Sequence, residues 1–169
     1  MGSVGLRWGG LPMDRSMIQV LVVDDFLAWR RFILSILQEQ PRFRIVGEAS
    51  DGLEAVQRAR ELKPDLILLD IGLPNLNGIE AARRIRDLSP KSKILFVSEN
   101  LSWDIVEEAM RTGAGGFVAK SDATGALLSG VEAVFNGKLF LSTRVAGNDL
   151  TNPNDEHTCA RVVLPYSKT

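Results

Sequence analysis

The sequence has almost no cysteine or histidine. Its 169 residues include one of each, Cys159 and His157. One cysteine cannot form an internal disulfide, and one histidine cannot supply the ligands of a histidine-based metal site. Disulfide scaffolds, zinc fingers and Cys/His clusters are therefore excluded. Any chemistry of this chain has to use carboxylates, hydroxyls and lysines.

An excess of charge and a long apolar run are also missing. The 20 Lys and Arg residues nearly balance the 21 Asp and Glu residues, for a formal charge of −1. This balance argues against binding nucleic acid or a membrane surface by bulk electrostatics. No apolar run approaches the roughly 20 residues of a membrane span. Residues 1–16 lack the apolar core of a signal peptide. We therefore expect a cytoplasmic protein.

What the sequence does have is a regular alternation of short apolar runs with helically periodic segments. The expected strands are residues 18–23, 43–48, 66–69, 94–97 and 116–119. The expected helices are residues 26–39, 52–62, 79–88, 103–111 and 123–136. Five strand–helix units with largely apolar strands predict a doubly wound α/β domain, with a parallel sheet covered on both faces. Three aromatic residues in these helices are interpreted as packing residues: Trp29, Trp103 and Phe135.

The two ends differ in character from this pattern. Residues 1–15 are Gly-rich and unpatterned, and we expect a flexible tail there. One domain is expected over residues 16–143, followed by a polar tail over 144–169. Residues 138–142 are predicted to be an extended packing segment and not a sixth strand–helix unit.

Polar side chains follow four of the expected strands at the point where each strand ends. They are Asp24, Asp25, Asp70, Ser98 and Lys120. In an open parallel sheet, ligands bind outside the carboxyl ends of the strands. Three neighbouring carboxylates repel one another and favour a bound cation, and oxygen ligands suit Mg²⁺. With a lysine and a hydroxyl beside them, they form the parts of a phosphoryl-transfer site with an aspartate as nucleophile.

Four motifs carry a resemblance to a known family: VLVVDD at 20–25, LILLDIGLPNLNGIE at 66–80, FVS at 96–98 and GGFVAKS at 115–121. In this order the sequence resembles the response-regulator receiver domain of the CheY-like superfamily. It is similar to receivers usually fused to a LuxR/NarL-like helix-turn-helix, although here we expect a receiver that stands alone. The resemblance implies a flavodoxin-like five-stranded parallel sheet, order 2-1-3-4-5, with five helices.

The resemblance also implies a role for each site residue. Asp70 would be the phosphoacceptor, and Lys120 would pair with the phosphoryl oxygen. The Mg²⁺ ligands would be Asp25, Asp70 and the backbone carbonyl of Gly72, with Asp24 acting through water.

Further positions would control switching and its rate. Ser98 and Phe117 would form the conformational switch. Gly72 and Asn100 would tune the lifetime of the phosphorylated state. Glu99 is a large acid where many relatives have a small residue, and it either points outward or repels an incoming phosphodonor.

The implied function is a single-domain response regulator in a two-component phosphorelay, and not an enzyme beyond slow autodephosphorylation. Its partners would be a sensor histidine kinase or phosphotransfer protein and a downstream protein, without direct DNA or membrane binding. The output surface would comprise residues 103–111, 116–119 and 123–136, with Trp103 as an exposed aromatic, and could form a homodimer.

Two other classes of protein, an enzyme and an inert interaction module, share parts of this pattern. A haloacid-dehalogenase-type phosphatase would need an aspartate where Gly72 stands, and a P-loop sequence is absent. A phosphorylation-independent interaction module with the same fold remains an alternative because of Glu99.

Overall fold

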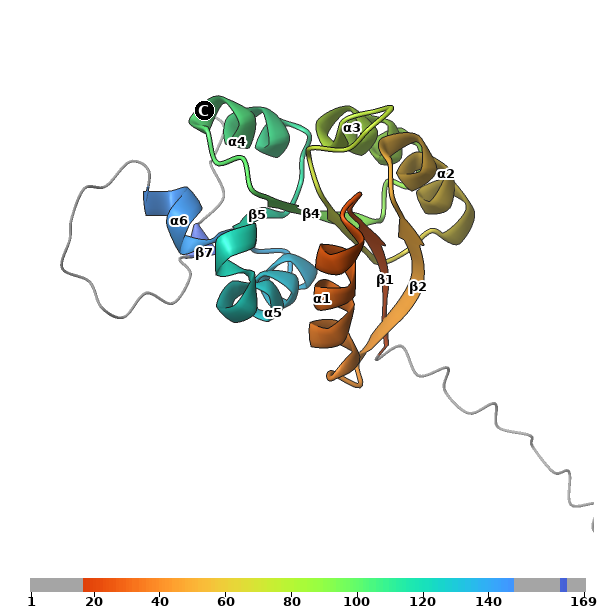
Figure 1. Ribbon diagram of the computed structural model, residues 1–169, viewed down its shortest axis with the longest axis horizontal. Coiled ribbons are helices and arrows are strands. Elements are labelled where there is room, and N and C mark those ends of the chain that lie inside the picture. The colour runs from red at the N-terminus through yellow and green to blue at the C-terminus, as the bar shows by residue number, and fades with distance from the viewer. Residues whose placement is uncertain (1–16, 148–161, 164–169) are drawn as a thin grey trace, which may run out of the picture.

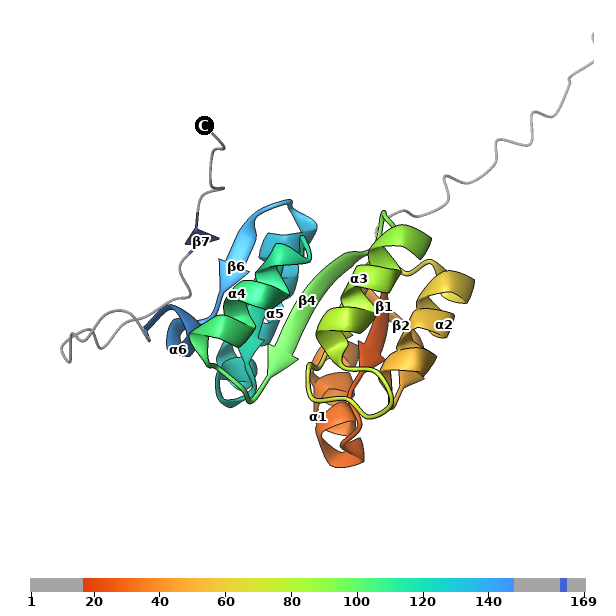
Figure 2. The same cartoon turned by 90° about the horizontal axis from the view of Figure 1, so that it is seen from above.

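The computed structural model describes residues 17–147 and 162–163. A central sheet lies between two layers of helices, with α1 and α5 on one face and α2, α3 and α4 on the other (Figures 1 and 2). The strands are β1 Ile18–Val23, β2 Phe43–Ala49, β3 Leu66–Leu69, β4 Lys93–Ser98, β5 Gly116–Ala119, β6 Leu139–Leu141 and β7 Val162–Val163. The helices are α1 Leu27–Gln38, α2 Gly52–Leu62, α3 Gly78–Leu88, α4 Trp103–Arg111, α5 Ala123–Phe135 and α6 Thr143–Ala146, with a 3₁₀ turn at Lys120–Asp122.

The strand order confirms the predicted doubly wound fold and corrects its strand count. In the described part of the chain the order is β2-β1-β3-β4-β5-β6-β7, so the predicted 2-1-3-4-5 order forms the larger part of the sheet. The segment predicted as an extended packing element, residues 138–142, contains β6, which pairs in parallel with β5. Val162–Val163 then pairs antiparallel with β6. The predicted five strands and five helices were therefore too few, because β6, β7 and α6 lie beyond α5.

Burial on both faces explains why the strands are almost continuously apolar. Along β1, Leu21 and Val23 belong to the core beneath α2, α3 and α4, whereas Val20 and Val22 belong to the core beneath α1 and α5. Successive side chains of a strand point to opposite faces, so the part of a strand that lies between two helical layers favours an apolar residue at each position. All four of these side chains are at most 2% exposed.

Local sequence signals set the helix ends around the carboxyl edge of the sheet. Asp51 and Asn77 begin α2 and α3 by accepting the backbone N–H of the residue three positions later, which satisfies an otherwise unpaired donor. Gly78, the first residue of α3, packs against the backbone of Asp70, where a Cβ would lie 1.9 Å from the Asp70 carbonyl oxygen. Its N–H donates to Ile71 O at 2.9 Å, so the β3–α3 loop folds back tightly over the end of β3.

No helix in the described residues has the length and apolar character needed to cross a membrane. The predicted tails lie mostly outside residues 17–147, and the domain limits at 16 and 143 stay predictions.

Candidate functional site

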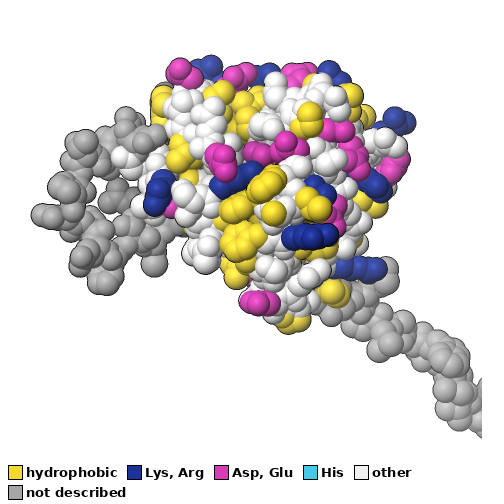
Figure 3. Space-filling view, in the orientation of Figure 1, with side chains coloured by type: hydrophobic (Ala, Val, Ile, Leu, Met, Phe, Trp, Pro, Cys, Tyr) yellow, Lys and Arg dark blue, Asp and Glu magenta, His cyan; other side chains and the backbone are white. Residues whose placement is uncertain are grey.

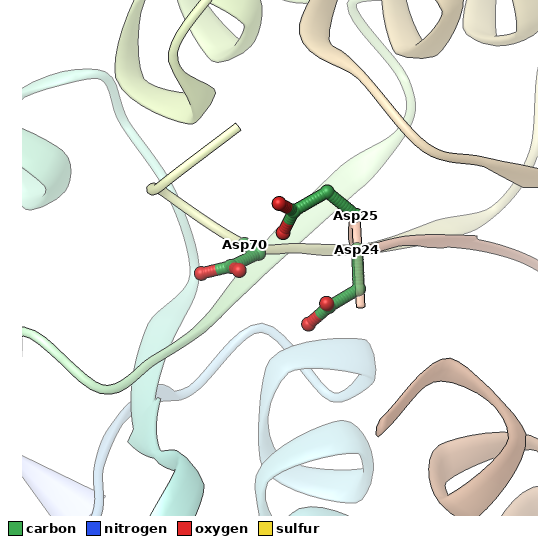
Figure 4. Close-up of side chains that lie close together, drawn as sticks. All are labelled: Asp24, Asp25 and Asp70. Atoms are coloured by element: carbon green, nitrogen blue, oxygen red, sulfur yellow. The ribbon is translucent and has the colours of Figure 1, made fainter. Parts of the chain in front are cut away.

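The strand register brings the polar residues that follow the strands to one edge of the sheet. Val23 of β1 is paired with Leu69 of β3, so Asp24 and Asp70 follow neighbouring positions, and Asp70 N–H donates to Val23 O at 3.0 Å. Ser98 of β4 is paired with Ala119 of β5, which places Ser98 beside the residue preceding Lys120. Figure 4 shows Asp24, Asp25 and Asp70 gathered at the ends of their strands.

A cleft of about 380 Å³ opens at this edge. Most of the predicted site residues line it: Asp25, Asp70, Gly72, Ser98, Glu99, Asn100 and Lys120. Phe26 and Ile71 complete the lining. The face seen in Figure 3 mixes acidic and basic side chains, and its hydrophobic side chains gather near α1.

Asp24 lies beneath the cleft. It is 1% exposed, and its Oδ1 accepts the backbone N–H of Phe26 at 2.8 Å. Its Oδ2 lies 2.6 Å from Lys120 Nζ but has no aligned hydrogen-bond donor, so the contact is an ion pair. Burial raises the pKa of Asp24, and the Asp70 carboxylate adds to this, although the contacts with Lys120 and with the Phe26 N–H oppose it. Asp24 is therefore a buried carboxyl group whose nearby cation is Lys120.

Lys120 bridges two of the three carboxylates. Its ammonium lies 2.6 Å from Asp24 Oδ2 and 3.0 Å from Asp70 Oδ2. Burial by itself would lower the pKa of Lys120, but the contact with Asp24 and the attraction to Asp70 together outweigh it and raise that pKa. Lys120 is therefore held as a cation between the two acids.

The Asp70 carboxylate contacts Lys120 and also lines the cleft. It is 6% exposed, and its Oδ1 accepts the backbone N–H of Ile71 at 2.7 Å while Oδ2 accepts from Lys120. The hydrogen bonds at both oxygens fix the orientation of the carboxylate at the cleft wall.

The donor set at this edge fits a hard divalent cation. One oxygen from each of Asp24, Asp25 and Asp70 lies within 4.8 Å of the others. Three carboxylates face one ammonium, so the cluster retains negative charge that a cation would neutralise. Asp25 is exposed, and together with Gly72 it lines the cleft, where a hydrated Mg²⁺ could be held by one or two carboxylates and waters. The residues present thus fit the predicted Mg²⁺.

The two predicted switch residues occupy different environments. Ser98 is 1% exposed and lines the cleft, and its Oγ accepts the backbone N–H of Asn100 at 3.2 Å. Phe117 is fully buried and packs on Phe96 with ring centroids 6.2 Å apart. Ser98 is therefore part of the site, whereas Phe117 lies in the core two residues before Ala119, the β5 partner of Ser98.

Comparison with known proteins decides the family. The response regulator receiver domain family matches residues 20–132. The chain belongs to this family. Receiver domains are phosphoacceptor switches of two-component signalling that bind Mg²⁺ at an acidic pocket and interact with histidine kinases or phosphotransfer proteins.

Two curated relatives and one solved structure illustrate the range of proteins that this receiver domain resembles. The transcriptional regulatory protein DegU of Brevibacillus brevis is 32% identical over 136 residues, covering 80% of this chain and 58% of that protein. A protein-glutamate methylesterase/protein-glutamine glutaminase of Thermotoga maritima is 46% identical over 110 residues, covering 64% of this chain and 32% of that protein. A chain of the CheX–CheY–BeF₃–Mg²⁺ complex from Borrelia burgdorferi has a TM-score of 0.66 and 27% identity, covering 70% of this chain and 89% of that chain. The chain thus spans 58% or less of these curated relatives.

Two residues of α1 contact the site of this receiver domain and were missed by sequence reasoning. Trp29, interpreted as a packing residue, has its ring centroid 5.3 Å from Lys120 Nζ, a cation–π distance. Arg30 donates from Nη1 to the backbone oxygen of Asp24 at 2.6 Å and from Nε to Glu48 at 2.7 Å. The sequence carries no signal for the first contact, because Trp29 fits the apolar pattern of α1. For Arg30 the only signal is a cation close after the Asp24-Asp25 pair.

Proposed function

We propose that this chain is a response-regulator switch that is phosphorylated on Asp70 in a Mg²⁺-dependent reaction. The phosphodonor would be a sensor histidine kinase or a phosphotransfer protein. The observation that carries the proposal is the position of Asp70, with Oδ2 held by Lys120 at 3.0 Å and the carboxylate at the wall of the cleft. A carboxylate fixed in this way can act as a nucleophile toward phosphorus without reorganising.

The same cleft would hold the metal. Asp25, Asp70 and the backbone carbonyl of Gly72 would bind Mg²⁺ directly, and Asp24 would act through water. The burial of Asp24 and its ion pair with Lys120 support this division, since Asp25 is the exposed member of the pair. Bound Mg²⁺ would supply charge neutralisation for the phosphoryl oxygens.

In the transfer step, an Asp70 oxygen forms a bond to the phosphorus of a phosphohistidine while the P–N bond breaks. The electron pair of that bond stays on the imidazole nitrogen, which takes up a proton. The phosphoryl group then presents an oxygen to Lys120, whose ammonium pairs with it. Slow hydrolysis of the acyl phosphate by water returns Asp70 to a carboxylate and releases inorganic phosphate, with Gly72 and Asn100 at the positions that tune the rate of this step.

Phosphorylation would reach the output surface through the two strands that end at the site. Ser98 ends β4 and leads to α4, and Lys120 follows β5 and leads to α5. A movement of Ser98 and Lys120 toward a phosphoryl group would therefore displace both the β4–α4 loop and the turn between β5 and α5. Phe117, inside β5, would change rotamer with Ser98.

The proposed output surface is the α4-β5-α5 face. Trp103 at the start of α4 is 50% exposed and offers an aromatic contact to a partner protein. The partner would be a downstream protein or a second copy of this chain, and direct binding to DNA is not part of the proposal. Sedimentation velocity with and without BeF₃⁻ and Mg²⁺ tests whether the chain forms a homodimer. If it does, a species with a larger sedimentation coefficient is expected only when both BeF₃⁻ and Mg²⁺ are present.

A phosphorylation assay tests the central claim. The chain is incubated with phosphoramidate, a P–N phosphodonor, in Mg²⁺ or in EDTA, and its intact mass is measured. We expect the mass gain of one phosphoryl group in Mg²⁺ only, and none in Asp70→Asn. An equal gain in Asp70→Asn, or no gain in the native chain with either phosphoramidate or acetyl phosphate, contradicts the proposal.

One observation favours a second candidate function, a phosphorylation-independent interaction module. Glu99 lines the same cleft as Asp25, Asp70 and Lys120. Its carboxylate adds negative charge at the place where an anionic phosphodonor would enter. Glu99→Ala separates the candidates. If the native chain is inert and the variant accepts phosphate, Glu99 blocks the chemistry and the second candidate holds. If the native chain already reacts, the second candidate is excluded.

A further inference from the structure

A second cleft, of about 420 Å³, lies at the opposite edge of the sheet. It is lined by residues at the amino ends of β4 and β6, at the ends of α3 and α5, in the α4–β5 loop and in the turn between α5 and β6. β4, whose arrow shows its direction in Figure 2, runs from Lys93 at this cleft to Ser98 at the cleft that contains Asp70. We call it the basic cleft, because its charged lining residues are Arg86, Lys93 and Lys138 and no acidic residue of the described chain lines it.

Arg86 is fixed in place before any ligand arrives. Its Nε donates to Thr112 O at 3.1 Å, and its Nη2 donates to Gly113 O at 2.6 Å. Gly113 allows this approach because a Cβ there would lie 2.1 Å from Arg86 Nη2, and its φ of +83° also favours glycine. These bonds use Nε and Nη2, so Nη1 is left to donate to a ligand.

The three cations of the basic cleft also lack neutralising partners. Several arginines elsewhere in the described chain form ion pairs, as Arg30 does with Glu48 and Arg83 with Glu108. Within residues 17–147, Arg86, Lys93 and Lys138 form none. Their positive charge is concentrated in one concave site of a chain whose formal net charge is −1. This arrangement attracts an anion.

The rest of the lining consists of aliphatic side chains and glycines. Ile94 and Val134 are 1% and 2% exposed, and Leu139 of β6 adds a third aliphatic side chain. Arginine and lysine together recognise phosphate, and an apolar wall can pack against an organic group. The volume is within the range of about 300–1,000 Å³ of small-molecule sites. We propose that the basic cleft binds a small organic phosphate of nucleotide size.

The concave shape favours a small molecule over a nucleic acid. A duplex needs phosphate contacts spread along an extended basic surface, whereas these three cations surround one cleft. The inference does not rest on the function proposed for Asp70, because the two sites lie at opposite edges of the sheet.

Isothermal titration with ATP, AMP and inorganic phosphate tests the proposal. The protein is the full chain carrying Asp70→Asn, in EDTA, so that metal-linked binding at the carboxylate cluster is removed. We expect saturable binding of at least one nucleotide. The double variant Lys93→Gln/Lys138→Gln, which leaves the Arg86 bonds intact, should weaken that binding at least tenfold.

The matched control is Lys91→Gln/Arg31→Gln, which removes two exposed cations that do not line the basic cleft and form no ion pair within residues 17–147. It should change nucleotide affinity less than twofold. Equal weakening in both double variants would overturn the proposal in favour of general electrostatics. Absence of saturable binding overturns it as well, and so does displacement of the nucleotide by duplex DNA at equal phosphate concentration.

Discussion

At the scale of single residues, the two adjacent aspartates have divided roles because one is buried and the other is exposed. Asp24 points beneath the cleft to Lys120, and Asp25 lines the cleft. A buried carboxylate is costly unless it is paired, and here one ammonium is shared between Asp24 and Asp70. The stability of the metal-free protein should therefore depend on how this small set of charges is balanced.

Replacing Asp24 by asparagine should stabilise the metal-free fold at neutral pH. The pKa of Asp24 in the folded protein is raised above its ordinary value of 3.8. The protonated Asp24 therefore stabilises the fold fully at pH values below 3.8, and this stabilisation is lost as the pH rises through the raised folded-state pKa. The asparagine side chain would keep an acceptor for the Phe26 N–H without the buried charge. Urea unfolding in EDTA should show the advantage of Asp24→Asn at pH 7 and its disappearance in acid. A variant less stable than the native chain at pH 7 contradicts the argument.

Replacing Lys120 by alanine should have the opposite effect on the metal-free fold. Removing one partner of a buried ion pair leaves uncompensated charge and costs about 3–5 kcal/mol. Mg²⁺ binding should persist and should restore most of the loss, because the carboxylates remain. Urea unfolding with and without Mg²⁺ measures both effects. Lys120→Arg, which keeps the charge, is the control, and an equal loss in this variant would show that packing rather than charge is responsible.

At the scale of secondary-structure elements, the site depends on how tightly the β3–α3 loop folds over Asp70. Gly78→Ala should destabilise the protein by about 1–3 kcal/mol, because the added methyl group would meet the Asp70 carbonyl. Although Gly78 does not line the cleft, phosphorylation by phosphoramidate should slow at least tenfold. Gly125→Ala in α5 is the matched control: nothing lies within 4 Å of its Cβ position, and alanine should stabilise the helix by up to about 1 kcal/mol. Unimpaired phosphorylation of Gly78→Ala would contradict this account.

Element boundaries up to α5 could be predicted because the strands inside the sheet are buried on both faces and each helix has its own periodicity. The spacing predicts α2 and β3 to the residue, Gly52–Leu62 and Leu66–Leu69. β6 could not be predicted, since Leu139–Leu141 is too short to carry a pattern and pairs only because β5 offers an open edge. The Trp29–Lys120 contact was beyond sequence reasoning for a similar reason, because it depends on how α1 packs beside the end of β5.

At the scale of the whole molecule, the fold continues past the fifth helix. Phe140 of β6 is 1% exposed and packs into the core beneath α1 and α5, and Ser142 Oγ accepts the N–H of Ala119 at 2.9 Å. Residues after α5 therefore contribute to the environment of β5, the strand that carries Phe117 and precedes Lys120.

Phe140→Ala should accordingly lower the unfolding free energy by about 3–5 kcal/mol, as for other buried phenylalanines. Thermal and urea unfolding followed by circular dichroism measure it. Leu53→Ala, at a side chain that is 50% exposed, should cost far less and serves as the comparison. A cost for Phe140→Ala no larger than for Leu53→Ala would mean that β6 is peripheral to the fold.

The two anchors of Lys120 have a mechanical consequence. Its ammonium is attached both to Asp24, which the proposed reaction leaves unmodified, and to Asp70, which that reaction modifies. A side chain attached at two points can release one and pivot about the other. In a phosphorylation cycle Lys120 would thus keep its contact with Asp24 while its contact with Asp70 changes. The end of β5 would then be returned to the same starting position each time the phosphoryl group leaves.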